Sequence, residues 1–353
     1  GALGALISYL GDNRLASMAH LRQIRIRASG EGMLLDAATQ RNLELVANIR
    51  DGGKTGTLLD VLDHTRTAMG ARTLRSTLLS PLTSASEIER RFDTVESLYE
   101  EPDLREDLFT ALDGMGDLER IAVRIETRKA SPRDLKGLTV VQAAIPGLVD
   151  LLHSFESDLL GELAGQLDPL EELTGQLLGA IVDEPPIALT DGGIIREGHS
   201  AELDRLRTLL GSGKQWIADL QQAERERTGI PSLKIGYNKV FGYYLEVTKT
   251  HAEKVPGEYI RKQTLVAAER YITPDLKEKE EEVLGAEERA AALEYELFDE
   301  LRSACALRLQ ALQRNAATLA MVDMLAAFCE AAVDNGYIRP RLTDDGTLLI
   351  EEG

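Results

Sequence analysis

Two long helical patterns enclose a segment with a different pattern. Between residues 198 and 228, apolar residues recur at helical spacing, namely Leu203, Leu206, Leu209, Leu210, Ile217 and Leu220. From residue 274 to about 314 they recur again, at Leu276, Val283, Leu284, Leu293, Leu297, Leu301 and Leu309. Within residues 229–273, β-forming side chains alternate with polar ones, namely Leu233, Ile235, Tyr237, Val240, Tyr243, Leu245 and Val247. A period of two is typical of half-buried strands, so the pattern predicts two helices that flank a small antiparallel sheet of three or four strands.

Turn and cap signals mark the borders of this segment. Asn238-Lys239 lies between the first two strand patterns, and residues 255–258, Val-Pro-Gly-Glu, supply a second turn. Thr273 is suited to cap the second helix, and Pro274 to be its first residue. Helices of about 30–40 residues extend ~45–60 Å, because each residue adds ~1.5 Å. We therefore expect the sheet at the far end of an antiparallel helical pair.

The remaining sequence is predicted to fold into stacked helices around one apolar core. Asp36 is a candidate N-cap for a helix that runs to about Asn48. Thr57 is a candidate N-cap for another helix, which Pro81 ends. These signals predict a mainly α-helical body ahead of the long helical pair.

Breaks divide the next part of the chain into shorter helices up to about residue 178. Ser84 or Ser86, together with Glu89, resembles a capping box. Residues 183–198 contain two prolines and a pair of glycines, which predict a hairpin or elbow that leads into the first long helix. Near the other end, residues 341–350 have the pattern of an opening strand of a further domain.

Charge separates residues 229–273 from the rest of the chain. The whole chain has a net charge of −19, whereas this segment holds seven basic and four acidic side chains, a net charge of +3. It also holds six of the chain's 16 Phe, Tyr and Trp residues. A basic, aromatic-rich patch on an acidic protein favours contact with a polyanion. In the competing interpretation, the aromatic residues form the core of the sheet and the lysines only keep it soluble.

Six residues of this segment are our candidates for contacts with the phosphates of a polyanion. Cations release counterions when they neutralise phosphates, and an amide at a turn can donate a hydrogen bond to a phosphate oxygen. Lys249 is the weakest candidate, because it could lie on the far face of the sheet. Tyr243 and Tyr244 are interpreted as sheet packing rather than as base-stacking residues. The six candidates are Lys234, Asn238, Lys239, Lys249, Arg261 and Lys262.

No sequence motif predicts catalysis, a cofactor or a metal site in this segment. Residues 53–55 and 211–214 contain Gly-Lys strings but lack the strand, loop and helix context of a phosphate-binding loop. The five histidines are scattered, without metal-ligand spacing. Cys305 and Cys329 are typical of a reducing cytoplasm, so we expect a cytoplasmic protein. No apolar run approaches ~18 residues, and no membrane span is expected.

Taken together, several strings in order along the whole chain resemble the MutS family of DNA mismatch-repair proteins. They are LDAATQRNLEL (35–45), TLLDVLDHTRTAMGARTLRSTLLSPL (57–82), GDLERIAVRI (116–125), SPRDL (131–135), DGGIIREG…ELD (191–204), ERERTGI (224–230), LKIGYNKVFGYYLEVT (233–248), RKQTLVAAERYITPDLKEKE (261–280) and DNGYIRP (334–340).

The resemblance implies a mainly α fold, in which a stacked-helix lever or core domain carries two long projecting helices and a small antiparallel, β-rich clamp domain. It assigns residues 1–195 to the first part of the lever and core, and residues 196–284 to the clamp domain with its tip at 229–273. Residues 285–342 would be the returning helix and the rest of the core. Residues 343–353 would be the truncated start of the following ATPase domain.

The resemblance also implies a function for the parent protein. Such proteins clamp double-stranded DNA as homodimers, read mismatches with an N-terminal domain, bind ATP and Mg in a C-terminal domain, and act with a partner of the MutL type. We expect the present chain to clamp DNA and transmit a signal, without the mismatch-reading or ATPase domain and without a cofactor of its own. The alternative is a helical arm for protein interaction or dimerisation that makes no direct contact with DNA.

Overall fold

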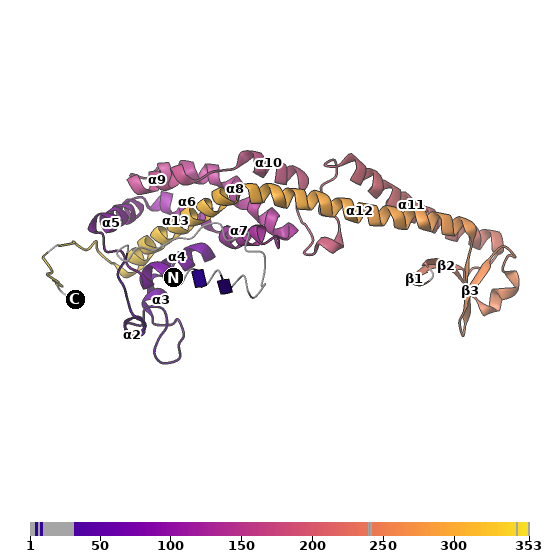
Figure 1. Ribbon diagram of the computed structural model, residues 1–353, viewed down its shortest axis with the longest axis horizontal. Coiled ribbons are helices and arrows are strands. Elements are labelled where there is room, and N and C mark those ends of the chain that lie inside the picture. Colours follow the sequence, from indigo (N-terminus) through magenta and orange to yellow (C-terminus); the bar gives the residue numbers. More distant parts are fainter. Residues whose placement is uncertain are drawn as a thin grey trace. The chain divides into compact units, whose positions relative to one another are not determined.

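A computed structural model describes residues 4–5, 8–9, 32–238, 240, 242–343 and 345–351. The described residues form helices and one four-stranded antiparallel sheet, which confirms the predicted fold class (Figure 1). The chain divides into two compact units. Unit 1 comprises Gly1–Leu178 and Leu301–Gly353, and unit 2 comprises Gly179–Glu300. The assignment of segments to lever and clamp roles stays a prediction.

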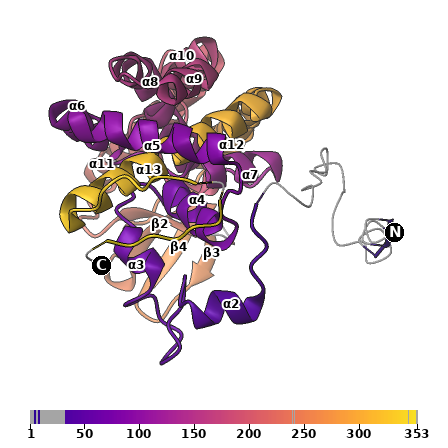
Figure 2. The ribbon, with the colours of Figure 1, turned by 90° about the vertical axis from the view of Figure 1, so that its left-hand side faces the viewer.

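Unit 1 is built around one long buried helix, α13, and α4, α5, α7 and α9 pack against it (Figure 2). α10 begins in this unit and ends just beyond its boundary. The helices are α2 (Ala37–Asn42), α3 (Leu58–Leu62), α4 (Ala68–Leu79), α5 (Ala85–Glu100), α6 (Pro102–Leu112), α7 (Leu118–Glu126), α8 (Pro132–His153), α9 (Asp158–Gln166), α10 (Glu171–Ala180) and α13 (Leu309–Asn335).

Unit 2 consists of an elbow, two long helices and the sheet. The elbow contains a short 3-10 helix, η2, and a second one, η3, follows β2. α12 starts in unit 2, and its last residues belong to unit 1. The elements are η2 (Leu189–Asp191), α11 (Ala201–Thr228), β1 (Lys234–Asn238), β2 (Gly242–Thr248), η3 (Lys249–Lys254), β3 (Ile260–Thr264), β4 (Ala268–Ile272) and α12 (Pro274–Leu307).

The predicted helix starts are correct where a polar side chain caps the backbone. The side chains of Asp36, Thr57 and Ser84 accept hydrogen bonds from the first turns of α2, α3 and α5. Thr273 likewise accepts from the Leu276 N–H, and Pro274 opens α12. Local capping chemistry is contained in a few adjacent residues, and it could therefore be recognised without the fold.

The predicted extents of three helices were wrong. The helix from Asp36 ends at Asn42 instead of about Asn48. The helix expected from Thr57 to Pro81 is split into α3 and α4. The final long helix breaks at Arg308, between α12 and α13, instead of running to about residue 314.

The break between α3 and α4 has a tertiary cause. Asp323 of α13 accepts hydrogen bonds from the backbone N–H groups of Arg66 and Thr67, at 2.9 and 2.8 Å, and from the Thr67 hydroxyl at 2.7 Å. The Thr67 hydroxyl in turn caps α4 through the Gly70 N–H. A carboxylate from 256 positions away thus starts a new helix where the local pattern suggests continuity.

Burial raises the pKa of Asp323 above its usual value, although the hydrogen bonds from Arg66 and Thr67 oppose this shift. Because the folded state holds this proton more tightly than the unfolded state, the stability contribution of Asp323 should fall as pH rises through the raised pKa. We expect unit 1 of the wild type to gain stability relative to Asp323→Asn as pH falls from 7 toward the usual aspartate pKa. Urea unfolding of both proteins by circular dichroism, at several pH values, measures the difference. A difference that does not vary with pH contradicts the expectation.

Two helices of unit 1 are, by length and composition alone, apolar enough to cross a membrane. They are α8 and α13, and 44% and 67% of their most apolar windows are buried inside the protein. The α13 side chain of Asn315 donates to Gln142 Oε1 and to the Asp168 carbonyl, so its polar group is satisfied within unit 1. Core packing accounts for the composition of these helices. Polar residues interrupt the apolar runs of both helices, so a search for an uninterrupted run of ~18 apolar residues does not find them.

Residues after α13 do not form the predicted strand in the described part of 341–350. α13 ends at Asn335, and Gly336 caps it in a left-handed conformation. Beyond it, Arg339 forms ion pairs with Glu89, Asp93 and Glu96 of α5, and these carboxylates raise the pKa of its guanidinium. An isolated extended segment cannot satisfy its backbone as a strand, and no described neighbour pairs with it.

The elbow of unit 2 is held by one buried carboxylate. Glu294 of α12 accepts hydrogen bonds from the consecutive N–H groups of Gly193, Ile194 and Ile195, at 2.7–3.0 Å. It also pairs with Arg207 of α11 at 2.8 Å. The predicted hairpin is reduced to a single bridge between Ile181 and Ile195, since these N–H groups bond to Glu294 instead of to a partner strand.

Candidate nucleic-acid interface

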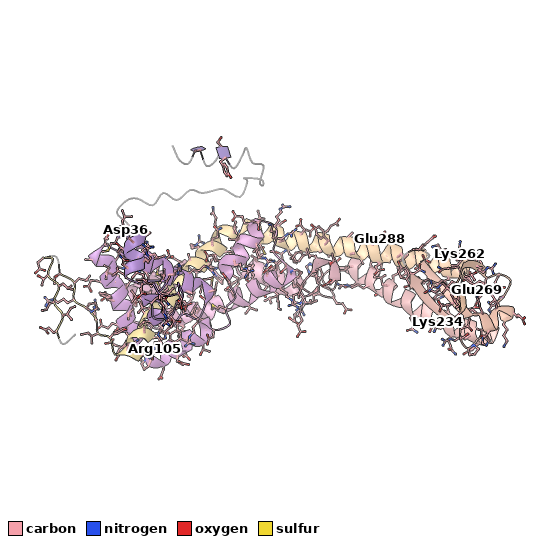
Figure 3. The ribbon with its side chains drawn as sticks, turned by 90° about the horizontal axis from the view of Figure 1, so that it is seen from below. Asp36, Arg105, Lys234, Lys262, Glu269 and Glu288 are labelled. Carbon is pink, nitrogen blue, oxygen red and sulfur yellow. The ribbon has the colours of Figure 1, made fainter. Side chains whose placement is uncertain are left out.

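The sheet has the strand order β1-β2-β4-β3, so β1 and β3 are its edges. β1–β2 and β3–β4 are hairpins, and β2 pairs with β4 in the centre. Because neighbouring strands lie ~4.8 Å apart, the two edges are separated by roughly 14 Å. Candidate residues on β1 and on β3 therefore lie at opposite edges, as Lys234 and Lys262 do in Figure 3.

One side of the sheet packs against α11 and α12. Ile217 of α11 and Leu276 of α12 belong to the same buried cluster as the central strands. Tyr243 is partly buried against this cluster, which favours the packing role predicted for it. The strand and loop members of the cluster are Ile230, Leu233, Leu245, Val247, Tyr259 and Tyr271.

The β1–β2 hairpin is fixed to α12 by a buried glutamate. Glu280 of α12, only 3% exposed, accepts a hydrogen bond from the Tyr243 N–H at 3.1 Å and pairs with Lys277. Gly242 has a φ of +73°, and a Cβ atom there would lie 2.0 Å from Glu280 Oε1. Asn238 accepts from the Val240 N–H at 3.0 Å and so stabilises the turn. Lys239 lies outside the described residues.

The other side of the sheet carries a paired set of charges. Lys234 of β1 lies 3.4 Å from Glu246 of β2, and Arg270 of β4 lies 3.0 Å from the same carboxylate. The guanidinium of Arg270 also stacks over the ring of Tyr244, 4.2 Å from its centroid. Tyr244 is buried and covers Gly236, where no Cβ atom would fit. Tyr244 is thus a packing residue, and Arg270, which was absent from our candidates, organises this side.

A second charged group lies beside β3. Arg261 pairs with Glu269 of β4 at 3.3 Å, and the Tyr271 hydroxyl donates a hydrogen bond to the same carboxyl. This hydrogen bond lowers the pKa of Glu269, and the charges of Arg261 and Lys249 lower it further. Burial and the bond to Glu269 raise the pKa of Tyr271 to about 12. The positive charges of Lys249 and Arg261 therefore both stabilise the ionised form of Glu269.

The five predicted candidates that the structure describes fall into separate places. Lys249, Arg261 and Lys262 come together near the β3–β4 hairpin, whereas Lys234 and Asn238 belong to β1. Lys262 is exposed in the bulge of β3, and within the described part of the chain it has no ion pair. Lys234 and Arg261 are 63% and 61% exposed in their ion pairs. Exposed pairs contribute only ~0–1 kcal/mol, so a phosphate can compete for these cations.

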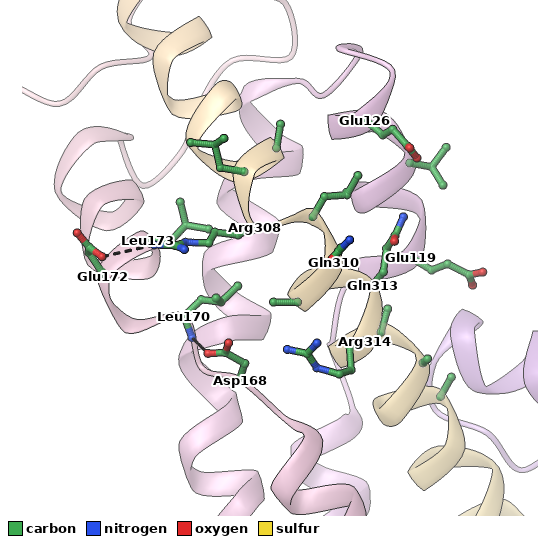
Figure 4. A pocket seen from close by; sticks show the side chains of 18 of the residues that line it. Glu119, Glu126, Asp168, Leu170, Glu172, Leu173, Arg308, Gln310, Gln313 and Arg314 are labelled. Carbon is green, nitrogen blue, oxygen red and sulfur yellow. Dashed lines mark hydrogen bonds and ion pairs between the residues drawn. The ribbon is translucent and has the colours of Figure 1, made fainter. Parts of the chain in front are cut away.

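Other described surfaces show less specific chemistry. A cleft of about 1430 Å³ in unit 1 is lined by the junction of α12 and α13 and by residues around Leu170 (Figure 4). Arg308 lies 3.7 Å from Glu172 at its rim. Among the described residues, no group of three or more His, Cys, Asp or Glu side chains could hold a metal ion.

Comparison with known proteins places the fold in a family. The family model for MutS domain III matches residues 38–329. The chain belongs to the MutS family. It is 47% identical over 352 residues to the DNA mismatch repair protein MutS of Salinibacter ruber, covering 100% of this chain and 39% of that protein.

Two other MutS proteins are about as similar to the chain. The protein of Symbiobacterium thermophilum is 48% identical over 352 residues, covering 100% of this chain and 40% of that protein. That of Methanosarcina barkeri is 44% identical over 353 residues, covering 99% of this chain and 39% of that protein. Both are named DNA mismatch repair protein MutS. The chain thus spans about two fifths of the MutS relatives that it matches.

Proposed function

We propose that the sheet of unit 2 binds the sugar-phosphate backbone of duplex DNA without sequence preference, as the clamp of a MutS-like mismatch-repair protein. The observation that carries this proposal is the grouping of Lys249, Arg261 and Lys262 near one hairpin of an otherwise acidic chain. Family membership supports it independently.

The charge distribution favours contact through the sheet only. The net charge of −19 repels DNA from most of the protein, whereas residues 229–273 carry +3. In unit 2 the sheet lies at one end of the long helices, away from the elbow, which Glu294 holds (Figure 1). With three to five cations the binding is expected to be weak and strongly salt-dependent, because each phosphate contact contributes about −0.9 to the slope of log K against log salt.

Charge reversal at Arg261 and Lys262 tests this proposal. We expect Arg261→Glu/Lys262→Glu to weaken binding of the full chain to random-sequence duplexes, and to make the salt slope shallower by about 2. Matched and mismatched duplexes should respond equally, since phosphates carry no sequence information. Fluorescence anisotropy at several low salt concentrations gives both the affinity and the slope.

A second double variant controls for net charge. Arg120 and Lys129 are exposed in unit 1, and Arg120→Glu/Lys129→Glu changes the net charge by the same amount. The control should retain the wild-type slope. Equal losses in both variants, or no binding by the wild type, would favour the alternative of a protein-interaction arm without DNA contact.

For the whole protein we propose the activities of its family. These are mismatch repair on double-stranded DNA as a homodimer in the cytoplasm, with a partner of the MutL type. ATP and Mg would be bound by a domain other than the one described, and the present chain would transmit the signal between that domain and the DNA. An ATPase assay of this chain should give no turnover. Turnover that survives repurification would contradict the assignment of the ATP site to another domain.

A further inference from the structure

One carboxylate of the sheet lies between two of the candidate cations. Glu269 of β4, labelled in Figure 3, has β2 on one side and β3 on the other. On β3, Arg261 is opposite Tyr271, two positions from Glu269. On the other side, the Lys249 N–H donates to the Ala267 carbonyl at 3.1 Å, again two positions from Glu269. Arg261 and Lys249 are therefore both diagonal cross-strand neighbours of Glu269, at the ~7–8 Å separation that long side chains bridge.

Glu269 is held in place, whereas the cations beside it are exposed. The Tyr271 hydroxyl donates a hydrogen bond to the Glu269 carboxylate, whose side chain is only 15% exposed. Arg261 is 61% exposed and reaches this carboxylate by one contact of 3.3 Å, and Lys249 is exposed as well. The hydrogen bond from Tyr271, followed by the charges of Arg261 and Lys249, lowers the pKa of Glu269. The carboxylate is therefore ionised at neutral pH.

A fixed carboxylate among exposed cations competes with a phosphate for them. A carboxylate and a phosphodiester each carry a negative charge, and both accept hydrogen bonds from a guanidinium. DNA that binds at Arg261 must replace the contact between Arg261 and Glu269, and its phosphate then lies near an ionised carboxylate. Like charges that lie a few ångströms apart repel each other even near a protein surface, so Glu269 weakens the contact with the phosphate.

The other face of the sheet holds a similar group. Successive side chains of a strand point to opposite faces, so Arg270 lies on the face opposite Glu269. There Glu246 pairs with Lys234 and Arg270 at 3.4 and 3.0 Å, and its side chain is 18% exposed. The two glutamates are thus alike in burial and in the number of cations beside them. Only Glu269, however, lies within the group of cations on which the proposed DNA contact depends.

We infer that Glu269 limits the affinity of the sheet for DNA by competing with phosphate for Arg261 and Lys249, and that DNA lies against the face of the sheet that carries Glu269. The inference rests on the proposed DNA binding and adds an internal competitor to it. The competition is independent of base sequence, because phosphates carry no sequence information. It shortens the lifetime of the contact, since differences in affinity at one interface appear mostly in the dissociation rate.

Removing the charge of Glu269 in the full chain tests the inference. Glu269→Gln keeps the shape of the side chain and an oxygen that accepts the hydrogen bond from Tyr271. We expect it to tighten binding to random-sequence duplexes about three- to fivefold, the effect of one exposed ion pair, and to steepen the salt slope by about 0.9. Glu246→Gln makes the same change in net charge on the opposite face, and it should retain the affinity and slope of the wild type. Fluorescence anisotropy at several low salt concentrations measures both.

The outcomes separate this inference from the proposed function. If charge reversal at Arg261 and Lys262 weakens binding but Glu269→Gln does not tighten it, the backbone contact stands and the competing role of Glu269 is wrong. An equal or larger gain in Glu246→Gln also overturns the inference, because the effect then follows net charge or the opposite face. A purely structural role predicts a lower urea midpoint for Glu269→Gln without tighter binding, which contradicts the inference as well. If the wild type binds no DNA, the proposed function and this inference are both wrong.

Discussion

Replacing Glu294 by alanine should destabilise unit 2 by about 3–5 kcal/mol, the range measured when one partner of a buried ion pair is removed. The substitution leaves the three N–H groups of the elbow without their acceptor and removes the shortest ion pair of the Arg207 guanidinium. Leaving buried donors unsatisfied costs more free energy than the original hydrogen bonds contributed in net, because water cannot reach the donors to replace the carboxylate.

The only tryptophan of the chain allows this loss to be measured locally. Trp216 of α11 packs beside the sheet cluster, so its fluorescence reports the unfolding of unit 2. Glu296→Ala, two positions away on the exposed face of α12, is the matched control and should change stability by less than about 0.5 kcal/mol. A urea transition of Glu294→Ala that coincides with this control would refute the role of Glu294 as the anchor of the elbow.

Gly242→Ala should have the second largest effect, a destabilisation of the sheet by about 3 kcal/mol. A left-handed backbone costs roughly 1–2 kcal/mol for a residue with a Cβ atom. At Gly242 that atom would also meet Glu280, which is buried and cannot move without losing the Tyr243 N–H. The hairpin that carries Asn238 should therefore detach from α12.

The matched control for this substitution is Gly257→Ala in the same unit. A Cβ atom at Gly257 meets nothing within 4 Å, and its φ is not positive. We expect an unchanged or slightly raised urea midpoint by Trp216 fluorescence. If Gly242→Ala retained the wild-type midpoint, the fit of Glu280 against this turn would not be as tight as the distances indicate.

Local features of the fold could be predicted because a few adjacent residues contain their cause. The alternation of residues 233–247 indicated strands, and Thr273 and Pro274 marked the start of α12. The same applies to Asp36 and Thr57, whose side chains cap the next turn. The strand order could not be predicted, since the pattern of each hairpin is the same whichever strand lies at the edge.

The candidate site was predicted only in part for the same reason. Residues 229–273 were chosen correctly as a cationic sheet segment, but composition could not reveal that Glu246 and Glu269 pair with Lys234 and Arg261. The turn between β3 and β4 was also not predicted, because Thr-Leu-Val-Ala contains no turn signal.

By itself, the sequence determined the capped starts of α2, α3, α5 and α12, the strand character of residues 229–273, the contrast in charge between that segment and the remainder, and the family. The tertiary structure alone decided where α4 begins, how the elbow is held, and which cations share an edge of the sheet. Each of these depends on a carboxylate from a distant position, such as Asp323, Glu294 or Glu269. In sequence such a residue is indistinguishable from a solvated surface charge, because its energy comes from the donors that only the folded chain brings to it.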